Sequence, residues 1–198
     1  SDKFIEQLTK KLLQKKAQTM LHPSIHSSFN RLKSERLGIE GLHFFEKEGE
    51  IEFNSGRQTI AVVTGKLFQE NPSLEEEVFG PFSLVVECES VNEIAACFKN
   101  IKGQLTASVL GEIDELNQYR DLLKVIQNKV GRIVFSGVPT GVEVCPSMHH
   151  GGPYPASTDS RFTAVGIDSI KRFARPIVFQ NCPDELLPDE LKFSNPLK

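Results

Sequence analysis

Apolar and polar positions follow two different periods along this chain, and together these periods predict an α/β protein. Apolar residues at spacings of three and four predict amphipathic helices over residues 1–20, 24–38, 91–99 and 112–129. Nearly continuous apolar runs predict buried strands over residues 59–64, 82–86, 105–110 and 132–135. Because apolar strands separated by helices are typical of parallel sheets covered on both faces, we expect such a sheet here.

A long segment without helix or strand periodicity follows the last of these strands. It is rich in Gly, Pro, Ser and Thr, and helical spacing resumes only at residues 167–174. Connections of this length usually build a binding or active-site surface, so we expect functional residues in it. A final strand is predicted over residues 175–180. The polar tail 183–198 carries leucine pairs that we expect to pack on a neighbouring surface.

Composition limits the classes of partner. A length of 198 residues suits one large domain, and a net charge of −3 argues against nonspecific nucleic-acid binding. The sequence has no apolar run of the roughly 20 residues that cross a bilayer and no signal-peptide pattern, so we expect a cytoplasmic protein without membrane partners. The four cysteines form no C-x-x-C pair, and we expect Cys88 and Cys97 to be buried and inert.

Residues 71–82 read N-P-S-L-E-E-E-V-F-G-P-F and leave two alternatives open. Three consecutive acids are usually a solvated turn, and this segment enters its strand at the amino end. Ligands of parallel sheets lie outside the carboxyl ends of strands, so position alone favours a structural turn over a binding site.

The run E-E-V-F-G-P resembles the E-E-[IV]-F-G-P signature of the aldehyde dehydrogenase superfamily. The resemblance implies that Glu77 binds the nicotinamide ribose of NADP or NAD and that Phe79 packs beside the nicotinamide. Both roles are chemically reasonable, because a carboxylate can accept hydrogen bonds from two ribose hydroxyls and a ring can hold a flat heterocycle.

The resemblance extends over essentially the whole chain, as a carboxyl-terminal segment of such an enzyme. Residues 103–110 and 131–136 are similar to two glycine-led strands of the superfamily. The loop around H-H-G-G-P-Y-P-A-S-T-D-S-R-F-T-A-V-G resembles the branch of α-ketoglutaric semialdehyde and NADP-preferring fatty aldehyde dehydrogenases. The resemblance to the superfamily implies a three-layer partial catalytic domain over residues 1–174. It also implies an oligomerisation strand with its tail over residues 175–198, and therefore a homo-oligomer.

The resemblance also implies the reaction: thiolate attack on an aldehyde, hydride transfer to the nicotinamide and thioester hydrolysis to a carboxylic acid. In the superfamily the catalytic cysteine, the general-base glutamate and the nucleotide-binding part precede the helix that matches residues 4–16. We therefore expect no catalytic residue in this chain, no activity from it alone, and the missing nucleotide-binding part as its partner. The alternative is a truncated, non-enzymatic assembly module that uses residues 175–180.

The remaining candidate chemistry lies in the long loop. Cys145, His149 and His150 form the sole Cys/His cluster in the sequence, which suggests a nucleophile–base pair, a metal site or a pocket lining. No complementary ligand pair exists elsewhere, so we expect no metal. Family position implies that His150 lines the aldehyde pocket. Arg161 could bind the carboxylate of an acidic semialdehyde, or Asp159 and Arg161 could organise the loop.

Overall fold

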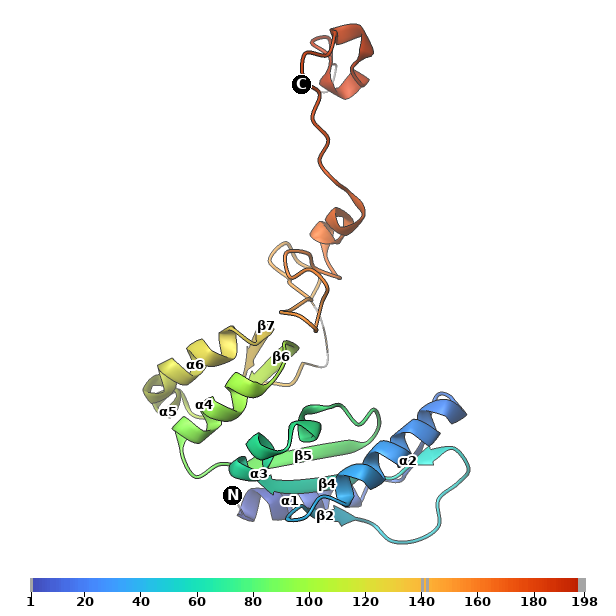
Figure 1. The fold of residues 1–198 in the computed structure, drawn as a ribbon, viewed down its shortest axis with the longest axis vertical. Helices are drawn as coiled ribbons and strands as arrows, with labels where there is room; N and C mark the ends of the chain where they lie inside the picture. Colours follow the sequence, from blue (N-terminus) through green and yellow to red (C-terminus); the bar gives the residue numbers. More distant parts are fainter. Residues whose placement is uncertain (1, 140, 142, 196–198) are drawn as a thin grey trace.

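The computed structural model describes residues 2–139, 141 and 143–195, so the predicted features at Ser1, Thr140, Val142 and 196–198 lie outside the described residues. Figure 1 shows a body of helices and small sheets, from which the carboxyl-terminal segment extends away. The helices are α1 (Asp2–Leu13), α2 (Pro23–Leu37), α3 (Gly65–Glu70), α4 (Val91–Asn100), α5 (Ile113–Leu116) and α6 (Arg120–Gln127). The strands are β1 (Gln18–Thr19), β2 (His43–Glu46), β3 (Ser55–Gly56), β4 (Thr59–Thr64), β5 (Phe82–Glu87), β6 (Gln104–Val109) and β7 (Val130–Phe135).

The four predicted apolar strands are all present and pair in parallel. β4 pairs with β5, with Thr59 opposite Phe82, and β6 pairs with β7, with Gln104 opposite Val130. The parallel expectation is therefore confirmed, but β5 and β6 do not pair, and two sheets stand where the pattern predicts one. Strand β2 was not predicted, and it adds an antiparallel edge to β4.

The core gathers on the central strand β4, whose apolar residues are almost completely buried. Val63 packs in a cluster with Phe68, Leu74 and Cys97, which come from α3, from the 3₁₀ turn Pro72–Glu75 and from α4. Helix α4 also contacts α6, so it lies between the part that carries β4 and β5 and the part that carries β6 and β7 (Figure 1). The helices α3, α4 and α6 thus connect the two sheets.

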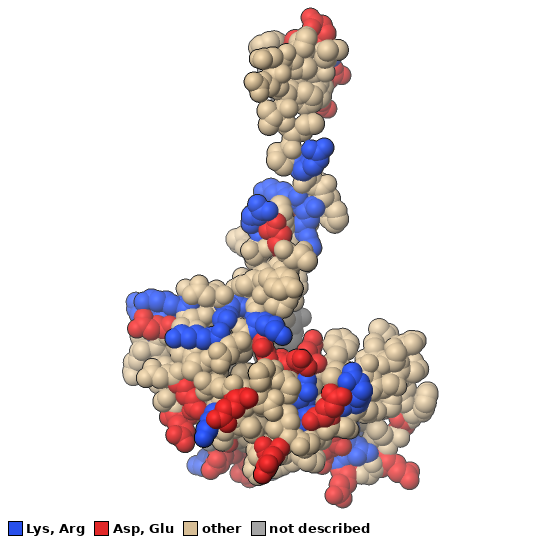
Figure 2. Space-filling model, viewed as in Figure 1, with Lys and Arg blue, Asp and Glu red and all other residues tan. Residues whose placement is uncertain are grey.

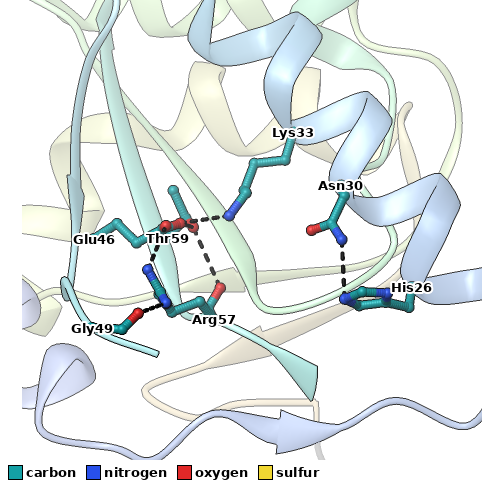
Figure 3. Close-up of polar contacts among 7 residues, drawn as sticks. All are labelled: His26, Asn30, Lys33, Glu46, Gly49, Arg57 and Thr59. Carbon is teal, nitrogen blue, oxygen red and sulfur yellow. Dashed lines mark hydrogen bonds and ion pairs between the residues drawn. The ribbon is translucent and has the colours of Figure 1, made fainter. Parts of the chain in front are cut away.

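A polar network joins α2 to β2 and β4 (Figure 3). The Lys33 ammonium donates to the Glu46 carboxylate at 2.6 Å, the Thr59 hydroxyl donates to the same carboxylate, and Arg57 lies 3.6 Å from it. Burial raises the pKa of Glu46, but the hydrogen bonds from Lys33 and Thr59 and the charges of Lys33 and Arg57 outweigh it and lower that pKa. The network therefore holds an ionised glutamate beneath α2.

Two predicted helices are shorter than their patterns. The helix predicted over residues 1–20 ends at Leu13, because Gln18 and Thr19 pair with Gly56 and Ser55 as a short ladder. The helix predicted over 112–129 divides into α5, a 3₁₀ turn at Asn117–Tyr119 and α6. Among the described residues, no helix is both long enough and apolar enough to cross a membrane.

The carboxyl-terminal segment differs from its prediction. A 3₁₀ helix covers Ile167–Phe173, while residues 175–180 form no strand with the described part of the single chain. Their pairing with another subunit stays a prediction. Figure 1 shows this segment extended away from the body and ending in the 3₁₀ turns Asp184–Leu186 and Asp189–Leu191. Leu186 is 73% exposed and Leu191 is 55% exposed, so these two tail leucines stay largely exposed in the described chain. Their packing on a neighbouring surface stays a prediction.

Candidate functional site

The acid run (residues 75–77) is held from both ends by buried apolar residues. Leu74 is 5% exposed and Val78 is 7% exposed, and Asn71 starts the preceding 3₁₀ turn by accepting a hydrogen bond from the Ser73 N–H at 3.3 Å. Such an ordered entry into β5 is what the structural-turn alternative predicts. It also fixes the backbone from which three carboxylates project.

The three acids have different surroundings. The Glu75 carboxylate accepts a hydrogen bond from the Lys102 N–H, and Glu76 forms an ion pair with Arg36 at 2.7 Å. Arg36 is 5% exposed, so it is a buried charge whose paired carboxylate lies in the acid run. Glu77 is exposed. Two of the three carboxylates therefore hold the run in place, and the third faces outward.

Sequence reasoning missed Arg36, because it lies on a helix 40 positions before Glu76 and carries no local signal. Glycine at position 80 is explained by the same helix: a Cβ there would lie 2.3 Å from a ring carbon of Phe29, which is 1% exposed. Helix α2 therefore packs directly against the chain just before β5. The neighbouring Phe79 ring projects outward and is 60% exposed.

An open cleft of about 630 Å³ separates the acid run from the start of β6 and from the loop after β7. Its lining combines acidic, basic and amide side chains with proline and alanine from the loop: Glu75, Glu76, Glu77, Lys102, Gly103, Gln104, Leu105, Thr106, Pro155 and Ala156. The structure thus brings Glu77 and the long loop to one cavity, although they are far apart in sequence.

The loop reaches this cleft by packing its backbone against the amino ends of β6 and β7. The Gly103 N–H donates to the Tyr154 carbonyl at 3.2 Å, and a Cβ at Gly103 would lie 2.1 Å from the Pro153 carbonyl oxygen. A Cβ at Gly131 would lie 1.8 Å from the Gly151 carbonyl oxygen. No side chain fits in these contacts, so the loop can follow this path only because residues 103 and 131 are glycines.

His150 is partly buried, and its backbone is held by two hydrogen bonds within the loop. Its N–H donates to the Thr163 hydroxyl at 2.9 Å, and its carbonyl accepts from the Ala164 N–H at 2.9 Å. The imidazole Nδ1 is buried and has no hydrogen-bond partner within the described residues. This nitrogen can therefore accept or donate a hydrogen bond that the described chain does not supply.

The cysteine of the Cys/His cluster lies beside a serine: the Cys145 sulfur is 3.4 Å from the Ser147 hydroxyl. A nucleophilic cysteine needs a base within hydrogen-bond reach, and the described residues place no imidazole at hydrogen-bond distance from this sulfur. Over the part of the chain that the structure describes, no group of three His, Cys, Asp or Glu side chains could hold a metal ion.

Arg161 forms a bidentate ion pair with Asp159, with contacts of 2.6 and 3.0 Å, and these hydrogen bonds lower the pKa of Asp159 to about 2. This ion pair is the contact expected if Asp159 and Arg161 organise the loop. The guanidinium nevertheless remains exposed, and Figure 2 shows basic side chains gathered over this part of the chain. Both roles of Arg161 are thus compatible with the geometry.

Comparisons with known proteins agree with the resemblance seen in the sequence. No family model matches the chain. It is 36% identical over 203 aligned positions to alpha-ketoglutaric semialdehyde dehydrogenase 2 of Azospirillum brasilense, covering 99% of the chain and 38% of that protein. It is 40% identical over 185 positions to alpha-ketoglutaric semialdehyde dehydrogenase of Acinetobacter baylyi, covering 88% of the chain and 35% of that protein. The chain belongs to the aldehyde dehydrogenase superfamily.

The fold is also that of aldehyde dehydrogenases. A betaine aldehyde dehydrogenase variant from Staphylococcus aureus, solved in complex with NAD⁺, matches with a TM-score of 0.66 and 15% identity, over 87% of this chain and 35% of that one. The predicted fold class is therefore confirmed. This superfamily segment spans little more than a third of the length of its curated relatives.

Proposed function

We propose that this chain is part of the catalytic domain of an NAD(P)-dependent aldehyde dehydrogenase that oxidises an aldehyde to a carboxylic acid. One observation supports the proposal: Glu77, whose neighbours are held by their own polar contacts, lines a cleft that the long loop lines on the other side. In this assignment the Glu77 carboxylate accepts hydrogen bonds from the nicotinamide ribose, and the exposed Phe79 ring packs beside the nicotinamide. The bound nicotinamide supplies the hydride acceptor.

The proposed substrate is α-ketoglutaric semialdehyde or a fatty aldehyde. The names of the two curated relatives support the former. His150 offers a polar substrate group its buried Nδ1, which has no partner among the described residues, and the Arg161 guanidinium offers charge to a carboxylate. In this proposal the catalytic cysteine, the general base and the nucleotide-binding part all lie outside this chain, so the chain alone is inactive.

The test joins the amino-terminal part of the Azospirillum relative to this chain and measures NAD(P)H formation with each aldehyde. We expect activity from the chimera and none from the chain alone. Replacing Glu77 by Gln should lower kcat/KM by at least about tenfold, because the neutral amide holds the ribose less well. Replacing exposed Glu40 by Gln is the matched control and should change little. Activity of the isolated chain would contradict the proposal.

A second function, assembly, rests on the carboxyl-terminal segment. Ile177 is 63% exposed and Val178 is 85% exposed, in a stretch whose backbone pairs with none of the described strands. Extended apolar segments of this kind pair with the sheet edge of another chain, which supports a homo-oligomer. Size-exclusion chromatography with light scattering should show a smaller species when Val178 is replaced by Asp. An unchanged mass would remove residues 175–180 from the interface.

A further inference from the structure

Cys88 and Cys97 lie side by side at the carboxyl end of β5. Cys88 is the first residue beyond β5, and Cys97 is on α4, on the face that packs into the core. Their sulfurs are 3.9 Å apart, and both are free thiols. Cys97 is 5% exposed, whereas Cys88 is partly exposed, so the pair can be reached from solvent on the Cys88 side.

The turn between the two cysteines is fixed by hydrogen bonds. The Ser90 hydroxyl accepts from the Glu93 N–H at 3.2 Å, and the Glu93 carboxylate accepts from the Glu89 N–H at 2.7 Å. This is close to a capping box, which orders the first turn of α4. The two cysteines are nine positions apart in the sequence, so local structure rather than chance packing holds the two thiols together.

The surroundings of Cys88 favour its protonated thiol. The Cys97 thiol donates weakly to the Gly65 carbonyl at 3.7 Å, and a Cβ at Gly65 would lie 2.9 Å from the Cys88 sulfur. Burial, then Cys97 and Glu93, raise the pKa of Cys88 to about 12. The Cys88 thiol is therefore a weak nucleophile at neutral pH, which agrees with the inert character expected from the sequence. An oxidant in excess still meets two sulfurs placed for bonding to each other.

We propose that Cys88 and Cys97 are an oxidative modification site, at which an oxidant of the peroxide class closes an intramolecular disulfide. The Cys88 sulfur loses its proton and attacks one peroxide oxygen, the O–O bond breaks, and water leaves with formation of a sulfenic acid. The Cys97 sulfur then loses its proton, bonds to the Cys88 sulfur and displaces a second water. Two thiols are oxidised by two electrons, and one peroxide is reduced to two waters.

Disulfide closure would link α4, the helix between the two halves of the body, covalently to the first sheet. Helix α4 packs on α3, beside β4 and β5, and on α6, beside β6 and β7 (Figure 1). A bond from Cys97 to the end of β5 fixes α4 covalently to the first sheet. The site is independent of aldehyde oxidation, because neither cysteine borders the cleft at Glu77.

The experiment uses the full chain with Cys145 and Cys182 replaced by Ser, so that only the pair remains, and hydrogen peroxide as the probe. Peptide mapping without reductant should find Cys88 linked to Cys97, with a loss of two hydrogen masses that dithiothreitol restores. The melting temperature should rise on oxidation and return on reduction. A thermal melt before oxidation verifies that this variant is folded.

The matched control adds Cys88→Ser, which changes the partly exposed member and spares buried Cys97. It should show neither the mass loss nor the shift in melting temperature. The proposal is overturned if Cys88 gains oxygen without forming a link, or if the pair stays reduced. It is also overturned if the unsubstituted chain instead links Cys88 or Cys97 to Cys145 or Cys182.

Discussion

The acid run and the long loop border the same cleft, yet different contacts hold them there. Side chains hold the acid run: buried Leu74 and Val78, and the ion pair between Glu76 and Arg36. Backbone holds the loop, whose carbonyls lie against glycines at the starts of β6 and β7. The first arrangement is sensitive to lost charge and lost packing, and the second to any added atom. The acid run and the long loop should therefore lose their places at the cleft under different mutations.

The largest effect is expected on the loop side. In Gly131→Ala the new methyl would meet the Gly151 carbonyl oxygen at 1.8 Å, and neither backbone can move without undocking the loop. We expect a loss of roughly 3 kcal/mol of unfolding free energy, measured by urea denaturation, and faster proteolysis of the loop. Gly141→Ala is the control, because a Cβ there meets nothing within 4 Å. Equal stability of the two variants would refute the docking contact.

A smaller effect is expected from the acid-run side. Glu76→Ala leaves Arg36 buried without its carboxylate, which should cost about 1–3 kcal/mol of unfolding free energy. Adding Arg36→Met removes the buried charge and should recover part of that loss, since breaking a buried pair costs more than replacing both partners. Urea denaturation of both single variants and the double variant measures this coupling. Purely additive losses would show that the ion pair does not hold the run.

The smallest effect is expected beneath α2, in the network around Glu46. The folded pKa of Glu46 lies below its ordinary value, so its contribution to stability is present above the unfolded pKa and is lost as pH falls through the folded one. Between roughly pH 5 and pH 3, Glu46→Gln should therefore lose less stability than the unsubstituted chain. Thermal melts across this range give the two slopes. Parallel slopes would mean that Glu46 titrates as it does in the unfolded chain.

The pattern of apolar and polar residues predicted those elements that depend mainly on local interactions. The run T-I-A-V-V-T forms β4, and the glycine-rich loop lies where its composition placed it. The pattern missed β2, whose Phe44 and Phe45 remain partly exposed at a sheet edge. It also extended the helix over 112–129 across Asn117, whose side-chain oxygen accepts from Arg120 and supports a tight turn instead.

The features that define the site depend on long-range pairing, which a linear pattern does not contain. The Arg36–Glu76 ion pair and the contact of Gly131 with Gly151 join segments that are distant in sequence. The ladder of Gln18 and Thr19 with Gly56 and Ser55 ends the first helix early for the same reason. Glu77 and Phe79 were found only because their motif resembles that of a superfamily, and their roles stay predictions.

The extended tail has a consequence for how the protein behaves on dilution. Ile177 and Val178 are exposed in the described single chain, so any gain from burying them arises only when a second surface is present. Such a gain depends on association between chains, which increases with protein concentration. The melting temperature should then rise with the logarithm of that concentration.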